Sequence, residues 1–203
     1  MTGESPRERR KRAVRQHISD VATALFVARG FDAVTVAEVA GAAGVSKMTV
    51  FNHFPGKETL FLDRHPDRLR ELVSVVRDRP GTESPAAALR RHQHELLAAR
   101  HPLSGTTDAV PGFWRVLRTT PALLACLHEQ EREIAEALAA VLTAESGDPR
   151  RSHAVAGLLT TTIGTVFATA VERLAAGERA RDVRRGQTAV IDQAFAVCHH
   201  GVA

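Results

Sequence analysis

The stretch that most constrains the fold is residues 43–54, which read A-G-V-S-K-M-T-V-F-N-H-F. Ahead of it, Thr35 and Glu38 have the spacing of a capping box, which predicts the start of a short helix. Gly44 readily takes a positive φ in a tight turn, and Ser46 can cap a second short helix. Two short helices joined by a glycine-containing turn form a helix-turn-helix.

The second of these helices has two different edges. Val50, Phe51 and Phe54 are expected to form an apolar edge that holds the helix against its domain. The other edge is small and polar, a composition that fits a DNA major groove. The residues expected to face base edges are Ser46, Lys47, Met48, Thr49 and Asn52. An ordinary helical hairpin of an all-α protein is the alternative, and the following F-N-H-F-P-G-K-E argues against it.

These residues resemble the TetR (tetracycline-repressor-like) family of transcriptional regulators. The family pattern is matched over about the first third of the chain by Ala22, Leu25, Phe26, Gly30, Phe31, Thr35, Val39, Ala40, Ala43 to Ser46, Thr49, Phe51, His53, Phe54, Lys57, Glu58 and Leu60. The chain departs from the pattern at Val39, at Met48 and at Phe51. Phe51 lacks the hydroxyl that family members often direct at a phosphate.

Phosphate contacts are expected beside the base-reading helix. Lys57 opens a further helix whose positive N-terminal end suits a phosphate, and in the family this helix start touches the DNA backbone. The first fifteen residues hold six basic and two acidic side chains, an excess of four positive charges that equals the net charge of +4 for the whole chain. Such a basic arm suits phosphates or a minor groove, and a merely solubilising tail is the alternative. The residues expected to hold phosphates are Thr35, His53, Lys57, Arg10 and Arg12.

The remainder of the chain is predicted to be all-α. Apolar residues recur at helical spacing and no segment alternates as a strand does, which indicates about nine helices in total. The first helix is expected from about Arg12 to Arg29. Residues 1–56 are predicted to form the basic arm and the DNA-binding domain, and residues 57–203 a helical ligand-binding and dimerisation domain. Pro66 predicts a kink or break near His65, with a simple helix boundary as the alternative.

Ala154 to Val171 contains no charged residue and is apolar or small on every side. One face can pack within its own domain, so another face needs a partner. The resemblance implies a four-helix dimer interface built from the helices around 150–176 and 182–198 of each subunit. A monomer with one central buried helix is the alternative.

The resemblance also implies a pocket for an unknown small-molecule effector in the C-terminal domain. Trp114 is the only tryptophan and lies on a short helix beside Pro111 and Gly112. The expected lining residues are Leu69, Val73, Leu96, Phe113, Trp114, Leu117, Leu124, His128, Thr162 and Phe167. Aromatic and aliphatic residues at helical spacing also form ordinary core, which is the alternative for each of them.

Other classes of protein receive little support. No G-x-S-x-G, H-E-x-x-H or P-loop motif occurs, so no enzyme activity is expected. Cys126 and Cys198 have no metal-binding spacing, and His92 and His94 point to different sides of a helix, so neither a metal site nor a cofactor is expected. A hydrophobic fraction of 44% and a charged fraction of 25% describe a soluble protein, and the charged N-terminus is unlike a signal peptide. We therefore expect a cytoplasmic protein with no membrane span.

The expected function is that of a ligand-responsive transcriptional repressor that binds a palindromic operator in double-stranded DNA as a homodimer. Release from the operator by a small molecule is implied by the resemblance. The alternative is an architectural DNA-binding protein or adaptor that uses the same fold without a ligand.

Overall fold

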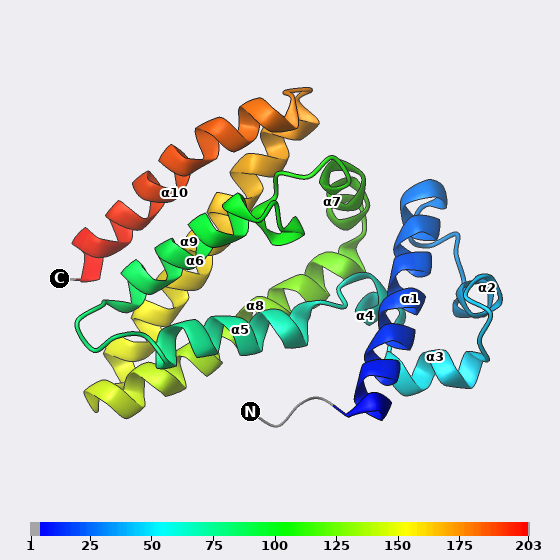
Figure 1. Cartoon of the computed structure of the whole chain (residues 1–203), viewed down its shortest axis with the longest axis horizontal. Coiled ribbons are helices and arrows are strands. Elements are labelled where there is room, and N and C mark those ends of the chain that lie inside the picture. Colours follow the sequence, from blue (N-terminus) through cyan, green and yellow to red (C-terminus); the bar gives the residue numbers. More distant parts are fainter. Residues whose placement is uncertain (1–4, 203) are drawn as a thin grey trace. The chain divides into compact units, whose positions relative to one another are not determined.

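The computed structural model describes residues 5–202, and the side chains of residues 5–198. Ten α-helices and one short 3-10 helix account for the regular structure of this part of the chain, which contains no strand (Figure 1). The helices are α1 (Pro6–Arg29), α2 (Val36–Ala42), α3 (Lys47–His53), α4 (Lys57–Phe61), α5 (His65–Arg77), α6 (Pro85–Ala98), η1 (Pro102–Ser104), α7 (Val110–Thr119), α8 (Pro121–Ser146), α9 (Pro149–Ala175) and α10 (Ala180–Val202). The all-α prediction is confirmed.

The chain divides into two compact units. Unit 1 contains the residues up to Arg64 together with Arg115–Leu127, and unit 2 contains His65–Trp114 and the residues from His128 onward. Unit 1 therefore holds α1 to α4, and unit 2 holds α5, α6, α9 and α10. The predicted boundary after Gly56 separates the chain by function, whereas these units are defined by their internal contacts. The predicted boundary therefore stays a prediction.

Unit 1 is built on the buried face of α1. Ile18, Ala22 and Phe26 recur at helical spacing and are fully buried. The Phe26 ring packs against the Phe31 ring with centroids 5.0 Å apart and edge-on against the Phe61 ring at 5.9 Å. Aromatic pairs in this geometry stabilise a small core beyond the area that they bury.

The first helix starts earlier than the sequence analysis expected. Helix α1 begins at Pro6 rather than near Arg12, because Ser5 caps it and forms a capping box with Glu8. Most of the predicted basic arm is therefore the first three turns of a helix, and the remainder, residues 1–4 with Glu4, lies outside the described residues.

The expected interruption near Pro66 is a helix boundary. Helix α4 ends at Phe61, Leu62 leaves helical geometry at φ −99° and ψ 44°, and α5 begins at His65. Pro66 is the second residue of α5, where its missing N–H removes no helical hydrogen bond. Because the expected fourth helix is divided into α4 and α5, the described residues contain ten α-helices where about nine were expected.

Unit 2 packs around α9. Leu159, Ile163 and Val166 of α9 share a core with side chains of α5, α6, α8 and α10. The threonines of α9 satisfy their hydroxyl groups within the helix: Thr160, Thr165 and Thr169 each donate to the carbonyl four residues earlier. Helix α9 is long and apolar enough to span a membrane by length and composition alone, a test that the core helix of a soluble protein also passes.

Candidate nucleic-acid interface

The helix-turn-helix forms as the sequence predicted. The Thr35 hydroxyl accepts the Glu38 backbone N–H at 3.2 Å, and the Glu38 carboxylate accepts the Thr35 backbone N–H at 2.8 Å. Gly44 makes the turn at φ +66°. The Ser46 hydroxyl then accepts the Thr49 backbone N–H at 3.0 Å and caps α3.

Helix α3 presents most of the predicted base-reading side chains to solvent. Ser46, Lys47, Met48 and Asn52 are exposed, while Val50 on the opposite side is buried. Thr49 is half-buried, and its hydroxyl lies 2.8 Å from the Ser46 hydroxyl. Four of the five side chains are therefore accessible at the start and on the exposed side of α3, and the roles of all five on DNA stay predictions.

The prediction for Phe51 is wrong. It was expected on the inner edge of α3 with Val50 and Phe54, but its side chain is 44% exposed. On a helix, Phe54 follows Val50 by four residues, whereas Phe51 is turned by about 100° and shares the face of Lys47 and Met48. The Lys47 ammonium stands 5.7 Å from the centre of the Phe51 ring. Because Phe51 follows Lys47 by four residues, helical spacing would have predicted that the two side chains share the exposed face.

Thr35 and Glu38 are joined to the end of α1. Arg29 pairs with the Glu38 carboxylate at 2.8 Å. The backbone N–H of Thr35 and the Arg29 side chain lower the pKa of Glu38 to about 2. Thr35 is exposed, but its hydroxyl donates to Glu38 at 2.9 Å, so a phosphate would compete with the capping carboxylate for it.

His53 ends α3 and is half-buried. Burial of the ring, followed by the positive charges of Lys11 and Arg15, lowers the pKa of His53 below its ordinary value. This shift favours the neutral form of the imidazole. It can still donate one hydrogen bond to a phosphate oxygen, without a full charge.

Lys57 makes contacts inside unit 1 that the sequence analysis did not expect. Its ammonium donates to the Phe31 carbonyl and lies 4.2 Å from the centre of the Phe31 ring and 5.6 Å from that of Phe26. These contacts hold the start of α4 against the end of α1. The predicted phosphate contact by Lys57 stays a prediction, and it would have to compete with them.

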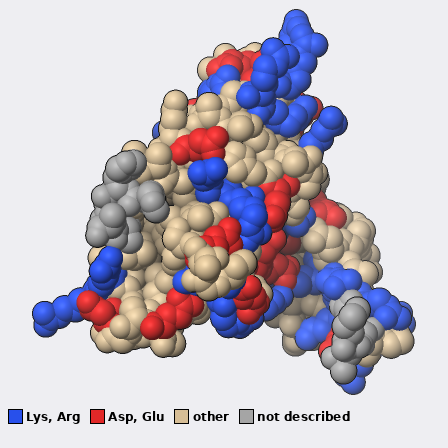
Figure 2. Space-filling model, turned by 60° about the vertical axis from the view of Figure 1, so that its left-hand side comes forward, with Lys and Arg blue, Asp and Glu red and all other residues tan. Residues whose placement is uncertain are grey.

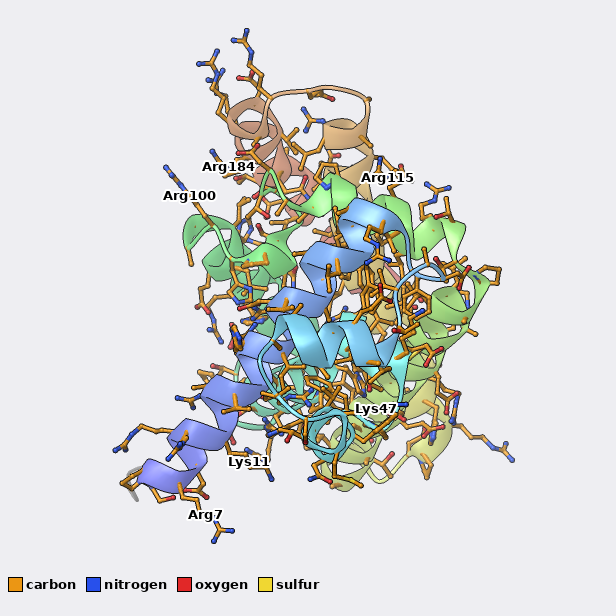
Figure 3. The ribbon with its side chains drawn as sticks, turned by 90° about the vertical axis from the view of Figure 1, so that its right-hand side faces the viewer. Arg7, Lys11, Lys47, Arg100, Arg115 and Arg184 are labelled. Carbon is orange, nitrogen blue, oxygen red and sulfur yellow. The ribbon has the colours of Figure 1, made fainter. Side chains whose placement is uncertain are left out.

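The basic residues of α1 provide positive charge next to the helix-turn-helix. Arg10 and Arg12 are exposed on its first turns. Arg7 and Lys11 extend from the same turns in Figure 3, which also labels Lys47 on α3. In the space-filling view, Lys and Arg side chains gather where α1 begins (Figure 2). A regular helix spaces these charges at fixed intervals, unlike an extended arm.

Arg15 is a residue that the sequence analysis counted only as positive charge. Its guanidinium donates to the His53 carbonyl at 2.7 Å and to the Asp63 carbonyl at 2.8 Å. It also lies 4.3 Å above the centre of the Phe54 ring. One side chain thus joins α1 to the end of α3 and to the segment after α4. Its position three residues before Ile18 on the buried stripe of α1 was the available signal.

The residues predicted for an effector pocket fall in both units. Leu117 and Leu124 lie in unit 1, and the others lie in unit 2. Within unit 2, Leu69 and Val73 pack against the main core, Leu96 is buried, and Phe113 is half-buried. His128 is exposed on α8, and its role in a pocket stays a prediction, as it does for the other residues.

Trp114 and Phe167 are brought together as a pair. Their rings meet edge to face with centroids 5.7 Å apart. The Trp114 Nε1–H is buried and has no hydrogen-bond acceptor among the described residues. The Thr162 hydroxyl, by contrast, is satisfied by the Leu158 carbonyl at 2.8 Å and lies next to the Cys198 thiol. Trp114 therefore has an unused donor, and Thr162 does not.

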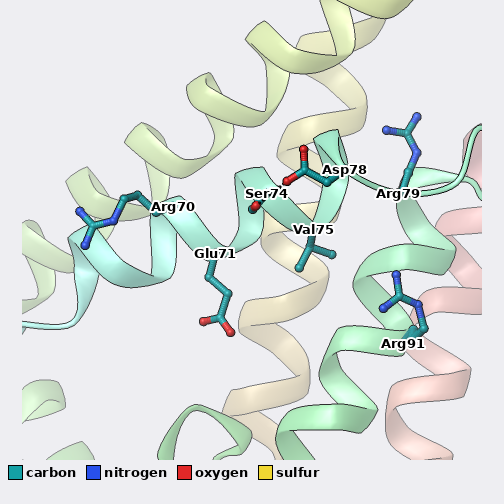
Figure 4. Close-up of a pocket in the computed structure, with 7 residues that line it drawn as sticks. All are labelled: Arg70, Glu71, Ser74, Val75, Asp78, Arg79 and Arg91. Carbon is teal, nitrogen blue, oxygen red and sulfur yellow. Dashed lines mark hydrogen bonds between the residues drawn. The ribbon is translucent and has the colours of Figure 1, made fainter. Parts of the chain in front are cut away.

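A surface hollow of about 490 Å³ lies elsewhere in unit 2 (Figure 4). It contains none of the predicted pocket residues. Its lining, mostly charged and polar, comes from α5, the segment after α5, and α6: Arg70, Glu71, Ser74, Val75, Asp78, Arg79 and Arg91. Its three arginines already have partners, since Arg70 pairs with Asp67, Arg79 with Glu145 at 2.7 Å and Arg91 with Glu83 at 3.1 Å. The hollow offers no free charge for a ligand.

Comparison with known proteins agrees with this geometry. Residues 18–63 match the family model described as bacterial regulatory proteins of the tetR family. The HTH-type transcriptional regulator TcmR of Streptomyces glaucescens is 28% identical over 71% of this chain and 66% of its own length. The HTH-type transcriptional repressor KstR2 of Rhodococcus jostii is 33% identical over 43% of this chain and 45% of its own length. The chain thus covers less than two thirds of the length of either relative.

Among solved structures, a complex of SmeT with triclosan has the same fold. It matches with a TM-score of 0.61 over 91% of each chain, at 20% sequence identity. At that identity the likeness extends to the fold alone.

Proposed function

Since the chain belongs to the TetR family of transcriptional regulators, we propose that it is a repressor that binds a palindromic operator as a homodimer and is released by a small molecule. The observation that carries this proposal is the exposed face of α3, which is fixed by its own N-cap and by buried Val50 and Phe54. A rigid short helix with exposed polar side chains suits direct readout in a major groove. Such a regulator acts in the cytoplasm, where the DNA is.

In this proposal, two groups of residues divide the work on DNA. Side chains of α3 read base edges: Ser46, Lys47, Met48, Thr49 and Asn52. Arg10 and Arg12 neutralise phosphates from the first turns of α1, with Thr35, His53 and Lys57 as further backbone contacts. Phosphate contacts set affinity and its salt dependence, whereas base contacts set the sequence preference.

Dimerisation through α9 and α10 is supported by the faces that these helices leave uncovered. On α9, Ala154, Gly157, Thr161, Thr165 and Ala168 are exposed or half-buried and recur at helical spacing. These small side chains permit close approach of another helix. On α10, Val190, Ala194 and Val197 follow the same spacing, and Val197 is 70% exposed. A symmetric pair of such faces explains why apolar residues remain in contact with solvent in a single chain.

The effector proposal depends on Trp114. A buried indole N–H without an acceptor is costly, and a ligand with a hydrogen-bond acceptor would remove that cost. The neighbouring Phe167 ring favours a partly aromatic ligand. The SmeT complex, a structural neighbour, contains triclosan, which supports a small aromatic molecule as the class to screen.

The effector proposal is tested by screening aromatic molecules for quenching of Trp114 fluorescence. A molecule that quenches the fluorescence is then expected to lower operator affinity at the same concentrations. A set of molecules that quench without any change in DNA binding would contradict the coupling.

The DNA-binding proposal is tested by selecting bound duplexes from a random library at two salt concentrations. We expect a palindromic motif whose half-sites lie about one turn apart, ~34–36 Å, and which persists at the higher salt. Loss of all enrichment at the higher salt would leave phosphate attraction alone. That result would favour the alternative, an architectural DNA-binding protein or adaptor without a ligand.

A further inference from the structure

Large apolar side chains are rarely exposed in this protein. Among the residues whose side chains the structure describes, three such side chains are exposed: Met48, Phe51 and Val197. Two of these three lie on α3, and Met48 is 68% exposed. A seven-residue helix thus concentrates apolar surface that the rest of unit 1 keeps buried. Exposed apolar patches of this kind mark contact surfaces.

Met48 and Phe51 lie on one face of α3. They are three residues apart, which places them next to each other on a helix. Asn52 follows Met48 by four residues, and Lys47 precedes Phe51 by four, so a polar side chain flanks the apolar pair on each side. This mixed face differs from the small, polar face that the sequence indicated.

The major groove of DNA presents one apolar group, the C5-methyl of thymine. We propose that Met48 and Phe51 contact thymine methyl groups, so that each half-site of the operator carries thymines opposite this pair. The proposal rests on the proposed function, because it takes α3 as the helix that enters the groove. In the complex, each thymine methyl group would pack against Met48 or Phe51. This contact would remove apolar surface of both groups from water, which is favourable.

Asn52 extends the same preference. A carboxamide can bond adenine through N6 and N7 in a bidentate pair, and an adenine on one strand places a thymine methyl on the other. Met48 and Asn52 are one helical turn apart, and so they reach neighbouring base pairs. Each half-site is therefore inferred to carry A·T pairs where Met48, Phe51 and Asn52 meet it.

The test removes single methyl groups from DNA. Each thymine of the selected duplex is replaced in turn by deoxyuridine, which pairs identically but lacks the C5-methyl. We expect affinity to fall by about three- to tenfold at one or two positions in each half-site. In the Met48→Ala or Phe51→Ala protein, uracil at the corresponding position should have no further effect. Because Met48 is exposed, Met48→Ala is not expected to disturb the fold.

Arg10→Ala is the matched control, since it removes a charge from α1 and leaves α3 unchanged. It should weaken binding to all duplexes and keep the full sensitivity to uracil. A selected motif without any uracil-sensitive thymine would overturn this inference and leave the proposed function standing. Uracil sensitivity that persists unchanged in both α3 variants would overturn it as well. Failure to select any motif would instead refute the proposed function on which the inference rests.

Discussion

One guanidinium holds three parts of unit 1 together. Arg15 bonds the carbonyl at the end of α3 and a carbonyl beyond the end of α4, and its planar group covers the Phe54 ring. A lysine in its place has a single ammonium group instead of a forked guanidinium, so it could not donate to both carbonyls in this geometry. The orientation of α3 within unit 1 therefore depends on a side chain whose donors are used inside the unit.

We expect Arg15→Gln to destabilise unit 1 by about 2 kcal/mol, because two charge-assisted hydrogen bonds and a cation–π contact are lost. Arg15→Lys should recover less than half of that loss. Thermal unfolding of the three proteins measures both effects, and Arg10→Gln is a control that removes an exposed charge from the same helix. Equal loss of stability in the Arg10 and Arg15 variants would contradict the account.

Lys57 allows a second test at the scale of one residue. Its ammonium contacts the Phe31 carbonyl and two aromatic rings, so Lys57→Met should lower the free energy of unfolding by about 1–2 kcal/mol. Lys47→Met, which removes an exposed lysine of α3, should leave unfolding nearly unchanged. A stability equal to that of the unaltered protein would show that the contacts of Lys57 contribute nothing. A drop of about one in the salt slope of DNA binding would separately establish its phosphate contact.

Helix starts and turns could be predicted from the sequence because each depends on a few neighbouring residues. Thr35, Gly44 and Ser46 have the predicted roles, and the S-P-R-E sequence from Ser5 to Glu8 would have given the start of α1 as well. The internal contacts of Arg15 and Lys57 could not be predicted this way. They join residues 26 to 48 positions apart, so the local sequence does not name their partners. For Arg15, helical spacing from Ile18 indicates only that the side chain lies beside the buried stripe of α1.

The capping box of α2 has a measurable pH dependence. Because the pKa of Glu38 is lowered to about 2, its capping contact stabilises the fold above about pH 4.5 and is lost as the pH falls toward 2. Carboxyl titration by NMR should find Glu38 still ionised at pH 3.5 if unit 1 remains folded there. Thr35→Ala should raise this pKa part of the way to its ordinary value and destabilise the helix by about 1 kcal/mol. An ordinary Glu38 pKa in the unaltered protein would refute the capping geometry.

At the scale of the whole molecule, helical spacing alone could not assign the effector pocket. It selected apolar residues without separating the core from a cavity lining. Leu96 became buried core, His128 became exposed, and Trp114 kept an unused donor. Only burial and hydrogen-bond partners in three dimensions distinguish these cases. The dimer through α9 and α10 stays a prediction; it rests on the uncharged stretch from Ala154 to Val171, part of which is accessible to solvent in a single chain.

The proposed dimer can be disrupted by one charge. Val197→Asp places a carboxylate on the exposed apolar side of α10, where burial against a partner would be costly. We expect monomers in analytical ultracentrifugation at concentrations where the unaltered protein is dimeric, with little change in helix content. Thr188→Asp lies on the opposite side of α10 and should remain dimeric. Dimers of equal strength in both variants would exclude this face as the interface.

The central claim is that two copies of the chain read two half-sites through α3. The most direct measurement is the affinity and stoichiometry of binding to the selected palindrome and to the same duplex with one half-site scrambled. We expect two copies on the palindrome and a loss of at least about a hundredfold in affinity when either half-site is scrambled. One bound copy, or equal affinity for the intact and scrambled duplexes, would contradict the central claim.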